Sequence, residues 1–183
     1  CDKEIKDELI RQIQKQIRKQ FGSAPLNNKN YGKIINEKHF TRIHNLIDPA
    51  KVVCGGDCNP GTLQIAPTVM DHVTFQDAVM QEEIFGPVLP VLTYDSLDEA
   101  IVNINSMAHP LALYIFTSNK AVAEKVTSHC GFGGGCVNDT IIHLATSEMG
   151  FGGFGESGMG SYHGKEGFNT FSHYKSIVDK KTW

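Results

Sequence analysis

The middle of the sequence alternates between strand and helix signals, and this alternation limits the fold more than any other feature. Segments of strand character at 88–94, 112–117 and 135–138 are separated by segments of helical character at 96–106 and 119–129. Strands joined by helices at this spacing favour right-handed crossovers and parallel pairing. We therefore expect an α/β fold with a largely parallel sheet flanked by helices.

Two more helices are predicted before this alternating part. Apolar residues recur at helical spacing across 2–21, and a second helical segment spans 37–47. Two short strand-like segments then follow at 51–54 and 63–69, joined by a stretch rich in turn residues. The N-terminal half therefore adds helices and a hairpin-like pair of strands to the fold.

The last third of the chain is rich in glycine, most of all between 149 and 167. Each glycine within a helix costs about 1 kcal/mol relative to alanine, so this segment is predicted to be a loop that passes close to another part of the protein. A turn of helix at 166–172 and a terminal strand at 173–180 complete the chain. An edge strand that finds no partner in its own chain is available to a second subunit.

The composition argues against several classes of function. The 183 residues carry a formal net charge of −3 and are 40% apolar. A balance so close to neutral does not favour binding to nucleic acid or to a membrane surface through bulk electrostatics. Apolar runs stay well below the roughly 18 residues of a transmembrane helix, and the charged N-terminal segment is unlike a signal peptide. We expect a cytoplasmic protein with no membrane segment and no nucleic-acid partner.

The cysteines indicate reduced thiols, because their number is odd and a chain of this length does not need disulfides. Four of them are candidate nucleophiles: Cys1, Cys54, Cys130 and Cys136. Cys54 and Cys136 lie in strand-like surroundings without an adjacent base, which favours a buried and inert thiol. The chain opens with Cys1-Asp2-Lys3 rather than Met, which is typical of a segment of a longer protein.

Three familiar motifs fail here. Residues 153–158 match the dinucleotide-binding fingerprint formally, but no buried strand precedes them and no helix follows them directly. The nucleophile-elbow pattern fails because Met159 stands where glycine is needed. Histidines and cysteines show no zinc-ligand spacing, so no metal site is expected.

The segment 82–87, Glu-Glu-Ile-Phe-Gly-Pro, is more informative. Two adjacent carboxylates precede a turn and an apolar strand. The segment is either a solvated turn or a ligand site, in which a carboxylate accepts hydrogen bonds from paired hydroxyls and Phe85 supplies a flat face for a ring. Residue types alone leave both interpretations open.

Several motifs, taken in order, resemble the C-terminal part of NAD(P)-dependent aldehyde dehydrogenases. They are Ile-Ala-Pro-Thr-Val at 65–69, the segment 82–87, Pro-Leu-Ala-Leu-Tyr at 110–114 and the glycine-rich stretch 151–165. The ending Ser-Gly-Met-Gly-Ser-Tyr-His-Gly-Lys, followed by Phe-Asn-Thr-Phe-Ser-His at 168–173, is similar to the class 3 branch, whose members act on fatty and aromatic aldehydes.

This resemblance implies a mechanism and a set of site residues. In that family a cysteine thiolate attacks the aldehyde, the thiohemiacetal passes hydride to the nicotinamide of NAD or NADP, and water hydrolyses the thioester. The residue matching Glu83 holds the nicotinamide ribose, and the one matching Phe85 packs beside the nicotinamide ring. The wall of the aldehyde tunnel, which suits an apolar substrate, is matched by His143, Leu144, Ala145, Phe151 and His163.

The glycine-rich active-site loop would then fold around that tunnel. Two departures concern it: Gly150 stands where the family usually has proline before Phe-Gly-Gly, and Ala145 stands where a hydroxyl is common. Both bear on substrate preference.

The nucleophile motif of the family, Gly-Gln-x-Cys-x-x-Pro, is expected upstream of Cys1, as are the water-activating Glu and the Rossmann turn. The resemblance therefore implies residues 1–172 as the C-terminal part of a catalytic domain, 173–183 as an oligomerisation strand, and a homodimer in the intact enzyme. The chain alone is expected to be inactive. The alternative is a non-catalytic binding or assembly module that retains the scaffold.

Overall fold

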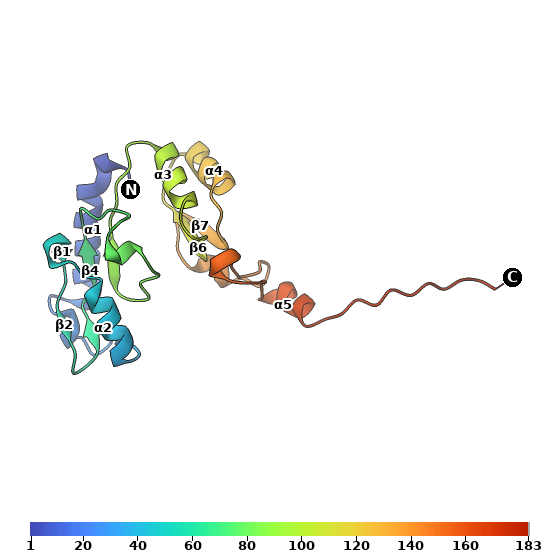
Figure 1. Ribbon diagram of the computed structural model, residues 1–183, viewed down its shortest axis with the longest axis horizontal. Helices are drawn as coiled ribbons and strands as arrows, with labels where there is room; N and C mark the ends of the chain where they lie inside the picture. Colours follow the sequence, from blue (N-terminus) through green and yellow to red (C-terminus); the bar gives the residue numbers. More distant parts are fainter. Residues whose placement is uncertain (183) are drawn as a thin grey trace. The chain divides into compact units, whose positions relative to one another are not determined.

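The computed structural model describes residues 1–182, and Trp183 lies outside the described residues. The chain forms two compact units, Cys1–Ser96 and Leu97–Trp183 (Figure 1). Among residues 1–182, no helix combines the length and the apolar character that crossing a bilayer requires.

The first unit begins with helix α1, Lys6–Phe21, which follows a short 3-10 turn. The Asp2 side chain caps this turn by accepting a hydrogen bond from the Glu4 amide. The helix ends where Gly22 adopts a φ of +83°, a conformation that glycine reaches without steric cost. Its buried residue Ile10 packs with Val69 and Val91. The helix predicted at 2–21 is therefore confirmed apart from its first turn.

Five strands of this unit form two sheets. They are β1 Val52–Cys54, β2 Cys58–Asn59, β3 Gln64–Ile65, β4 Thr68–Met70 and β5 Val88–Pro90. In the three-stranded sheet, β4 lies between β1, to which it runs antiparallel, and β5, to which it runs parallel. The separate antiparallel pair consists of β2 and β3. The connection between β1 and β4 is thus a hairpin-like excursion, as the turn-rich residues predict.

Helix α2, Glu37–Asn45, covers the core of this unit. Its N-cap Asn36 accepts a hydrogen bond from the His39 amide at 2.9 Å. Phe40 and Ile43 are its buried residues, and Ile43 is fully buried. They pack in one cluster with residues of the strands and loops, namely Ile65, Met70, Val73, Val79 and Val88. Short 3-10 helices lie at Pro25–Asn27, Pro49–Lys51 and Ala78–Met80.

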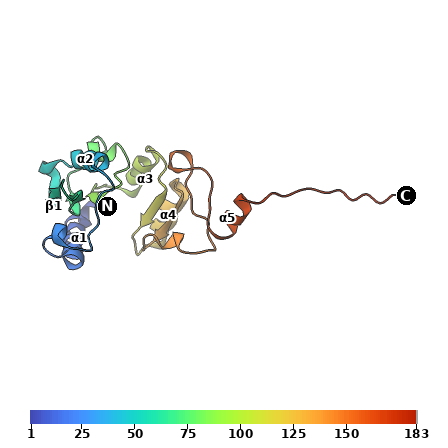
Figure 2. The same ribbon diagram turned by 90° about the horizontal axis from the view of Figure 1, so that it is seen from below.

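The second unit contains the strand–helix–strand part of the predicted alternation. It contains, in chain order, helix α3 (Leu97–Asn105), strand β6 (Ala112–Ile115), helix α4 (Lys120–His129) and strand β7 (Gly134–Val137). Strands β6 and β7 are parallel, and α4 forms the crossover between them. Figures 1 and 2 show α3 and α4 beside these strands. The core of the unit consists of Ile101, Ile115, Val126 and Cys130.

The mixed α/β fold is confirmed, but the expectation of one largely parallel sheet is wrong for the described residues. Their strands form three separate sheets, two of which contain an antiparallel pair. The strands are also short: the predicted strand 63–69 divides into β3 and β4 around Pro67, which has no amide hydrogen to donate to a ladder. Apolar runs that look like one strand in the sequence are therefore split by backbone chemistry.

The glycine-rich stretch contains a 3-10 turn at Gly155–Ser157 and helix α5 at Gly164–Thr170. After α5, residues 173–182 form neither helix nor strand and run out as an extended chain (Figures 1 and 2). The strand predicted at 173–180 is not formed and has no pairing partner within residues 1–182. Its pairing with a second subunit and the domain boundary at 172 stay predictions. The final residue of the segment 173–183 is not among the described residues.

Candidate functional site

The loop 82–87 of the first unit is fixed from helix α2 by Arg42. The Nη2 of Arg42 donates to the carbonyl of Ile84 at 2.7 Å. Its Nη1 donates to the Oε1 of Glu82 at 3.0 Å and, more weakly, to the carbonyl of Glu83 at 3.4 Å. One guanidinium therefore binds three successive residues of the loop.

The far end of the loop is fixed by packing and by the sheet. A Cβ built on Gly86 would lie 2.8 Å from the Cδ1 of Ile43, so the backbone here touches the buried side chain of α2. The carbonyl of Pro87 accepts a hydrogen bond from the Thr68 amide at 2.8 Å. Loop 82–87 is thus anchored on both sides of Phe85.

Phe85 and Glu83 are presented to solvent by this anchored loop. The Phe85 side chain is 80% exposed, and its φ of +51° is rare for an aromatic residue. Glu83 is exposed, and within residues 1–182 its carboxylate has no hydrogen bond or salt bridge. Burial of both side chains in the core would exclude a ligand site here. Both side chains are exposed, so a ligand can reach them.

A second set of predicted residues meets in the Leu97–Trp183 unit. The rings of His143 and Phe151 have centroids 5.7 Å apart, and Phe151 stacks on His163 at 5.8 Å. Tyr114 of β6 lies 5.7 Å from His143, and Tyr162 lies 5.9 Å from Phe151. Three of the five predicted wall residues therefore belong to one continuous series of ring contacts.

Glycine allows the backbone segments that carry these rings to approach closely. Phe151 and Tyr162 exchange two backbone hydrogen bonds, of 2.7 and 3.0 Å. A Cβ on Gly133, just before β7, would lie 2.4 Å from the carbonyl oxygen of Gly152. The glycine-rich segment therefore passes against the start of β7, at a distance that only glycine permits.

His143 is the buried member of the ring series, with 7% of its surface exposed. Its Nδ1 lies 3.5 Å from the Sγ of Cys136, and its Nε2 is buried without a hydrogen-bond partner in the part of the chain that the structure describes. A buried polar atom without a partner costs free energy. This nitrogen is therefore a position where an additional polar group would be stabilising.

Leu144 and Ala145 follow His143 in the chain, Leu144 half-buried and Ala145 exposed. Neither side chain has a ring, so the ring contacts do not test them, and their place in the wall stays a prediction. Tyr114 and Tyr162 are the members of the ring series that sequence reasoning missed. The motifs that contain them were recognised, but nothing in the sequence indicates that Tyr114 of β6 meets His143, which lies in the 3-10 turn Ile142–Leu144.

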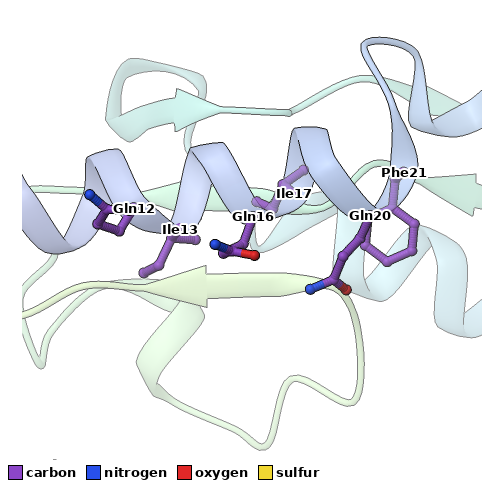
Figure 3. Close-up of a pocket in the computed structure, with 6 residues that line it drawn as sticks. All are labelled: Gln12, Ile13, Gln16, Ile17, Gln20 and Phe21. Carbon is purple, nitrogen blue, oxygen red and sulfur yellow. The ribbon is translucent and has the colours of Figure 1, made fainter.

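Among the hollows in the described residues are two that no carboxylate, histidine, lysine or arginine side chain lines. One, of about 380 Å³, lies along the glycine-rich backbone around Phe151 and Tyr162. The other, of about 250 Å³, runs along one flank of α1 (Figure 3) and is lined by Gln12, Ile13, Gln16, Ile17, Gln20 and Phe21. The α1 hollow offers apolar surface and amides only, so it supports no catalytic chemistry.

Cys136, which the sequence placed without an adjacent base, has the Nδ1 of His143 at 3.5 Å from its Sγ. Metal chemistry finds little support within residues 1–182. Those residues contain no group of three or more histidine, cysteine, aspartate or glutamate side chains that could hold a metal ion. Burial raises the pKa of the Cys130 thiol, which keeps it protonated. In contrast, an unpaired carboxylate and an exposed ring on one loop fit a ligand with paired hydroxyls and a flat ring, such as the nicotinamide riboside part of NAD or NADP.

Comparisons with known proteins show the family of the chain. A profile described as "Aldehyde dehydrogenase family" matches residues 1–177. The chain is 46% identical over 180 residues to the 4,4'-diaponeurosporen-aldehyde dehydrogenase of Staphylococcus aureus. It is also 46% identical over 178 residues to the dimeric NADP-preferring aldehyde dehydrogenase of Mus musculus. Each match covers 97% of this chain and 39% of the relative. The chain therefore belongs to the aldehyde dehydrogenase family.

Solved structures support the same assignment. The substrate-bound state of Staphylococcus aureus AldH matches with a TM-score of 0.92 and 42% identity, over 99% of this chain and 41% of that one. An aldehyde dehydrogenase of Mycobacterium tuberculosis, complexed with NAD+, matches with a TM-score of 0.83 and 27% identity, over 100% and 39%. The name of the mouse relative includes NADP and the Mycobacterium tuberculosis structure contains NAD+, in keeping with the coenzymes that the resemblance implies. The chain spans about two fifths of the length of these relatives.

Proposed function

We propose that this chain supplies the coenzyme-side loop and part of the aldehyde-side wall in a longer protein that oxidises aldehydes to carboxylic acids with NAD or NADP. The observation that carries the proposal is the presentation of Glu83 and Phe85. Both are exposed on a loop that α2 and β4 fix in place, and the Glu83 carboxylate has no partner within residues 1–182.

The roles proposed for these two side chains are geometric. The Glu83 carboxylate accepts hydrogen bonds from the two hydroxyls of the nicotinamide ribose, and the Phe85 ring limits the tilt of the nicotinamide. When bound, the coenzyme supplies the hydride acceptor of the reaction. A loop that restricts unproductive poses of a reactant lowers the entropic part of a barrier. An anchored backbone suits this task better than a mobile one.

The aldehyde-side wall is assigned to His143, Leu144, Ala145, Phe151 and His163. The stacked rings of Phe151 and His163 offer a largely apolar surface, which favours fatty or aromatic aldehydes over charged ones. The glycine-rich loop that carries Phe151 is proposed as the active-site loop.

The nucleophilic cysteine is proposed to lie in the longer protein upstream of Cys1, with the residues that bind the rest of the coenzyme. The 183-residue chain alone is then inactive. Residues 173–183 are proposed to pair with a second copy in a homodimer, in keeping with the word "dimeric" in the name of the mouse relative. A cytoplasmic location is part of the same proposal.

The test is equilibrium binding of NAD+ and NADP+ to the complete protein and its Glu83→Gln variant. Loss of the charge removes charge-assisted hydrogen bonds to ribose, so we expect affinity to fall by roughly tenfold or more. Glu124→Gln, at an exposed position on α4, is the matched control and should bind as the parent does. Unchanged affinity in Glu83→Gln would refute the ribose role. Absence of coenzyme binding by the parent would favour the assembly module.

A further inference from the structure

Helix α2 forms hydrogen bonds to the proposed coenzyme loop through Arg42, a residue that belongs to no recognised motif. Arg42 donates to the carbonyls of Glu83 and Ile84 and to the carboxylate of Glu82. We infer that Arg42 is a positioning residue for coenzyme binding: it holds the backbone ahead of Phe85 and occupies Glu82, which leaves Glu83 for the ribose. The inference rests on the function proposed for Glu83.

The first step concerns the backbone. A non-glycine residue persists at positive φ only where its surroundings determine its conformation. For Phe85 these surroundings are the Arg42 hydrogen bonds on the N-terminal side and the contact between Gly86 and Ile43 on the other. Without Arg42, the carbonyls of Glu83 and Ile84 lose their donor in α2. The Glu83–Ile84 and Ile84–Phe85 peptide groups can then rotate.

The second step concerns the paired acids. Glu82 lies 3.0 Å from the guanidinium, and the Arg42 side chain is only 24% exposed, so the two charges compensate one another. The neighbouring Glu83 contributes its carbonyl and not its carboxylate. The two adjacent acids therefore have different tasks: Glu82 satisfies the arginine, while the carboxylate of Glu83 remains available to a ligand.

The third step concerns the residue type. A planar guanidinium presents several N–H groups in fixed directions and reaches three acceptors at once. A lysine ammonium carries the same charge on a flexible stem and cannot hold the same pattern. Lysine at position 42 should therefore keep the ion pair with Glu82 and lose part of the order of the loop.

The experiment uses the complete protein and two readouts. Hydrogen–deuterium exchange over residues 82–88, without coenzyme, reports the order of the loop; equilibrium titration with NAD+ and NADP+ reports affinity. In Arg42→Met we expect roughly tenfold faster exchange and a comparable loss of affinity, because hydrogen bonds to a charged donor are lost. The KM for aldehyde should change far less than the KM for coenzyme.

Two further variants complete the design. Arg42→Lys should fall between the parent and Arg42→Met in both readouts, and it also serves if Arg42→Met does not fold. The matched control is Arg11→Met, because Arg11 lies on the exposed face of α1 and, within residues 1–182, pairs only with Glu8. It should leave loop exchange and affinity unchanged.

The outcomes separate this inference from the proposed function. Parent-like exchange in both Arg42 variants would overturn the inference, whatever Glu83→Gln does. Faster exchange with unchanged affinity, while Glu83→Gln binds weakly, would also overturn it and leave the ribose role intact. Unchanged affinity in Glu83→Gln would remove the ribose role on which this inference rests.

Discussion

Gly86 lies directly against Ile43: a Cβ at position 86 would stand 2.8 Å from the Cδ1 and 3.0 Å from the Cγ2 of the fully buried isoleucine. This contact joins the proposed coenzyme loop to the core of the first unit. Because Ile43 also packs with Ile65 and Val88, it has little room to withdraw. The loop and the core therefore cannot shift independently at this point.

The Gly86→Ala substitution should consequently destabilise the protein by about 1–3 kcal/mol through overpacking. Shortening the opposing side chain in Ile43→Val removes the nearest atom and should recover part of that loss in the double variant. Free energies of unfolding from denaturant titration give the coupling between the two sites. Additive effects in the double-mutant cycle would show that the contact is not tight.

Substitutions of Phe85 should affect stability and coenzyme binding in different ways. A left-handed backbone costs a residue with a Cβ about 1–2 kcal/mol, and glycine escapes that cost while losing more entropy on folding. Phe85→Gly should therefore retain the parent's stability or gain up to about 1 kcal/mol, yet bind coenzyme more weakly. Phe85→Ala loses the ring without relieving the backbone, so it should weaken binding with no gain. Parent-like coenzyme affinity in both variants would remove the role of the ring.

Acid should weaken the attachment of α1 to the sheet. Burial favours a higher pKa for Asp71, but hydrogen bonds from Lys6, at 2.7 Å, and from the His72 amide hold that pKa below the usual 3.8. A pKa lowered by folding stabilises the protein above the unfolded value and loses its effect as the pH falls through the folded one. We therefore expect the melting temperature to decrease as the pH is lowered below about 4.

The variant Asp71→Asn should be less stable at neutral pH and should lose this part of the acid response. Some response should remain, because a hydrogen bond from Lys51 lowers the pKa of Asp77 as well. Melting curves of parent and variant between about pH 6 and about pH 3 provide the measurement. Parallel pH profiles would show that Asp71 contributes nothing to the acid response.

The close approach of the glycine-rich segment to β7 predicts opposite effects at two glycines. Alanine at Gly133 would place its Cβ 2.4 Å from the Gly152 oxygen and 2.7 Å from that of Leu111, and backbone atoms cannot rotate away. We expect a loss of about 3 kcal/mol, at the upper end of overpacking costs.

In contrast, a Cβ on Gly167 within α5 meets nothing within 4 Å. Gly167→Ala should therefore stabilise the protein by up to about 1 kcal/mol, as alanine does in a helix interior. Thermal unfolding of both variants checks the pair. Equal effects of the two substitutions would contradict the described path of the loop.

Local signals were sufficient for the helices of this chain. The glycine after Phe21 ends α1 through its positive φ, and Asn119 begins α4 by accepting a hydrogen bond from the Ala121 amide. Such caps act within a few residues, so the sequence alone shows them. Strand pairing depends on distant segments, which explains why the apolar runs predicted one sheet while residues 1–182 form three.

The candidate site was predictable only in part. Glu83 and Phe85 could be proposed from a motif, but the exposed carboxylate and the left-handed backbone at Phe85 are properties of the folded loop. Arg42 gave no signal, because 40 residues separate it from Glu82 and its helix position resembles any solvated polar face. The contact between Tyr114 and His143 was likewise not predictable from the sequence. Contacts of this kind require coordinates.

The most direct test of the central claim is a high-resolution structure of the complete protein with NAD+ or NADP+ bound. The account predicts a Glu83 carboxylate oxygen within about 3.2 Å of a hydroxyl of the nicotinamide ribose, with the Phe85 ring against the nicotinamide. A bound coenzyme whose ribose hydroxyls contact other residues, with Glu83 left in solvent, would contradict it.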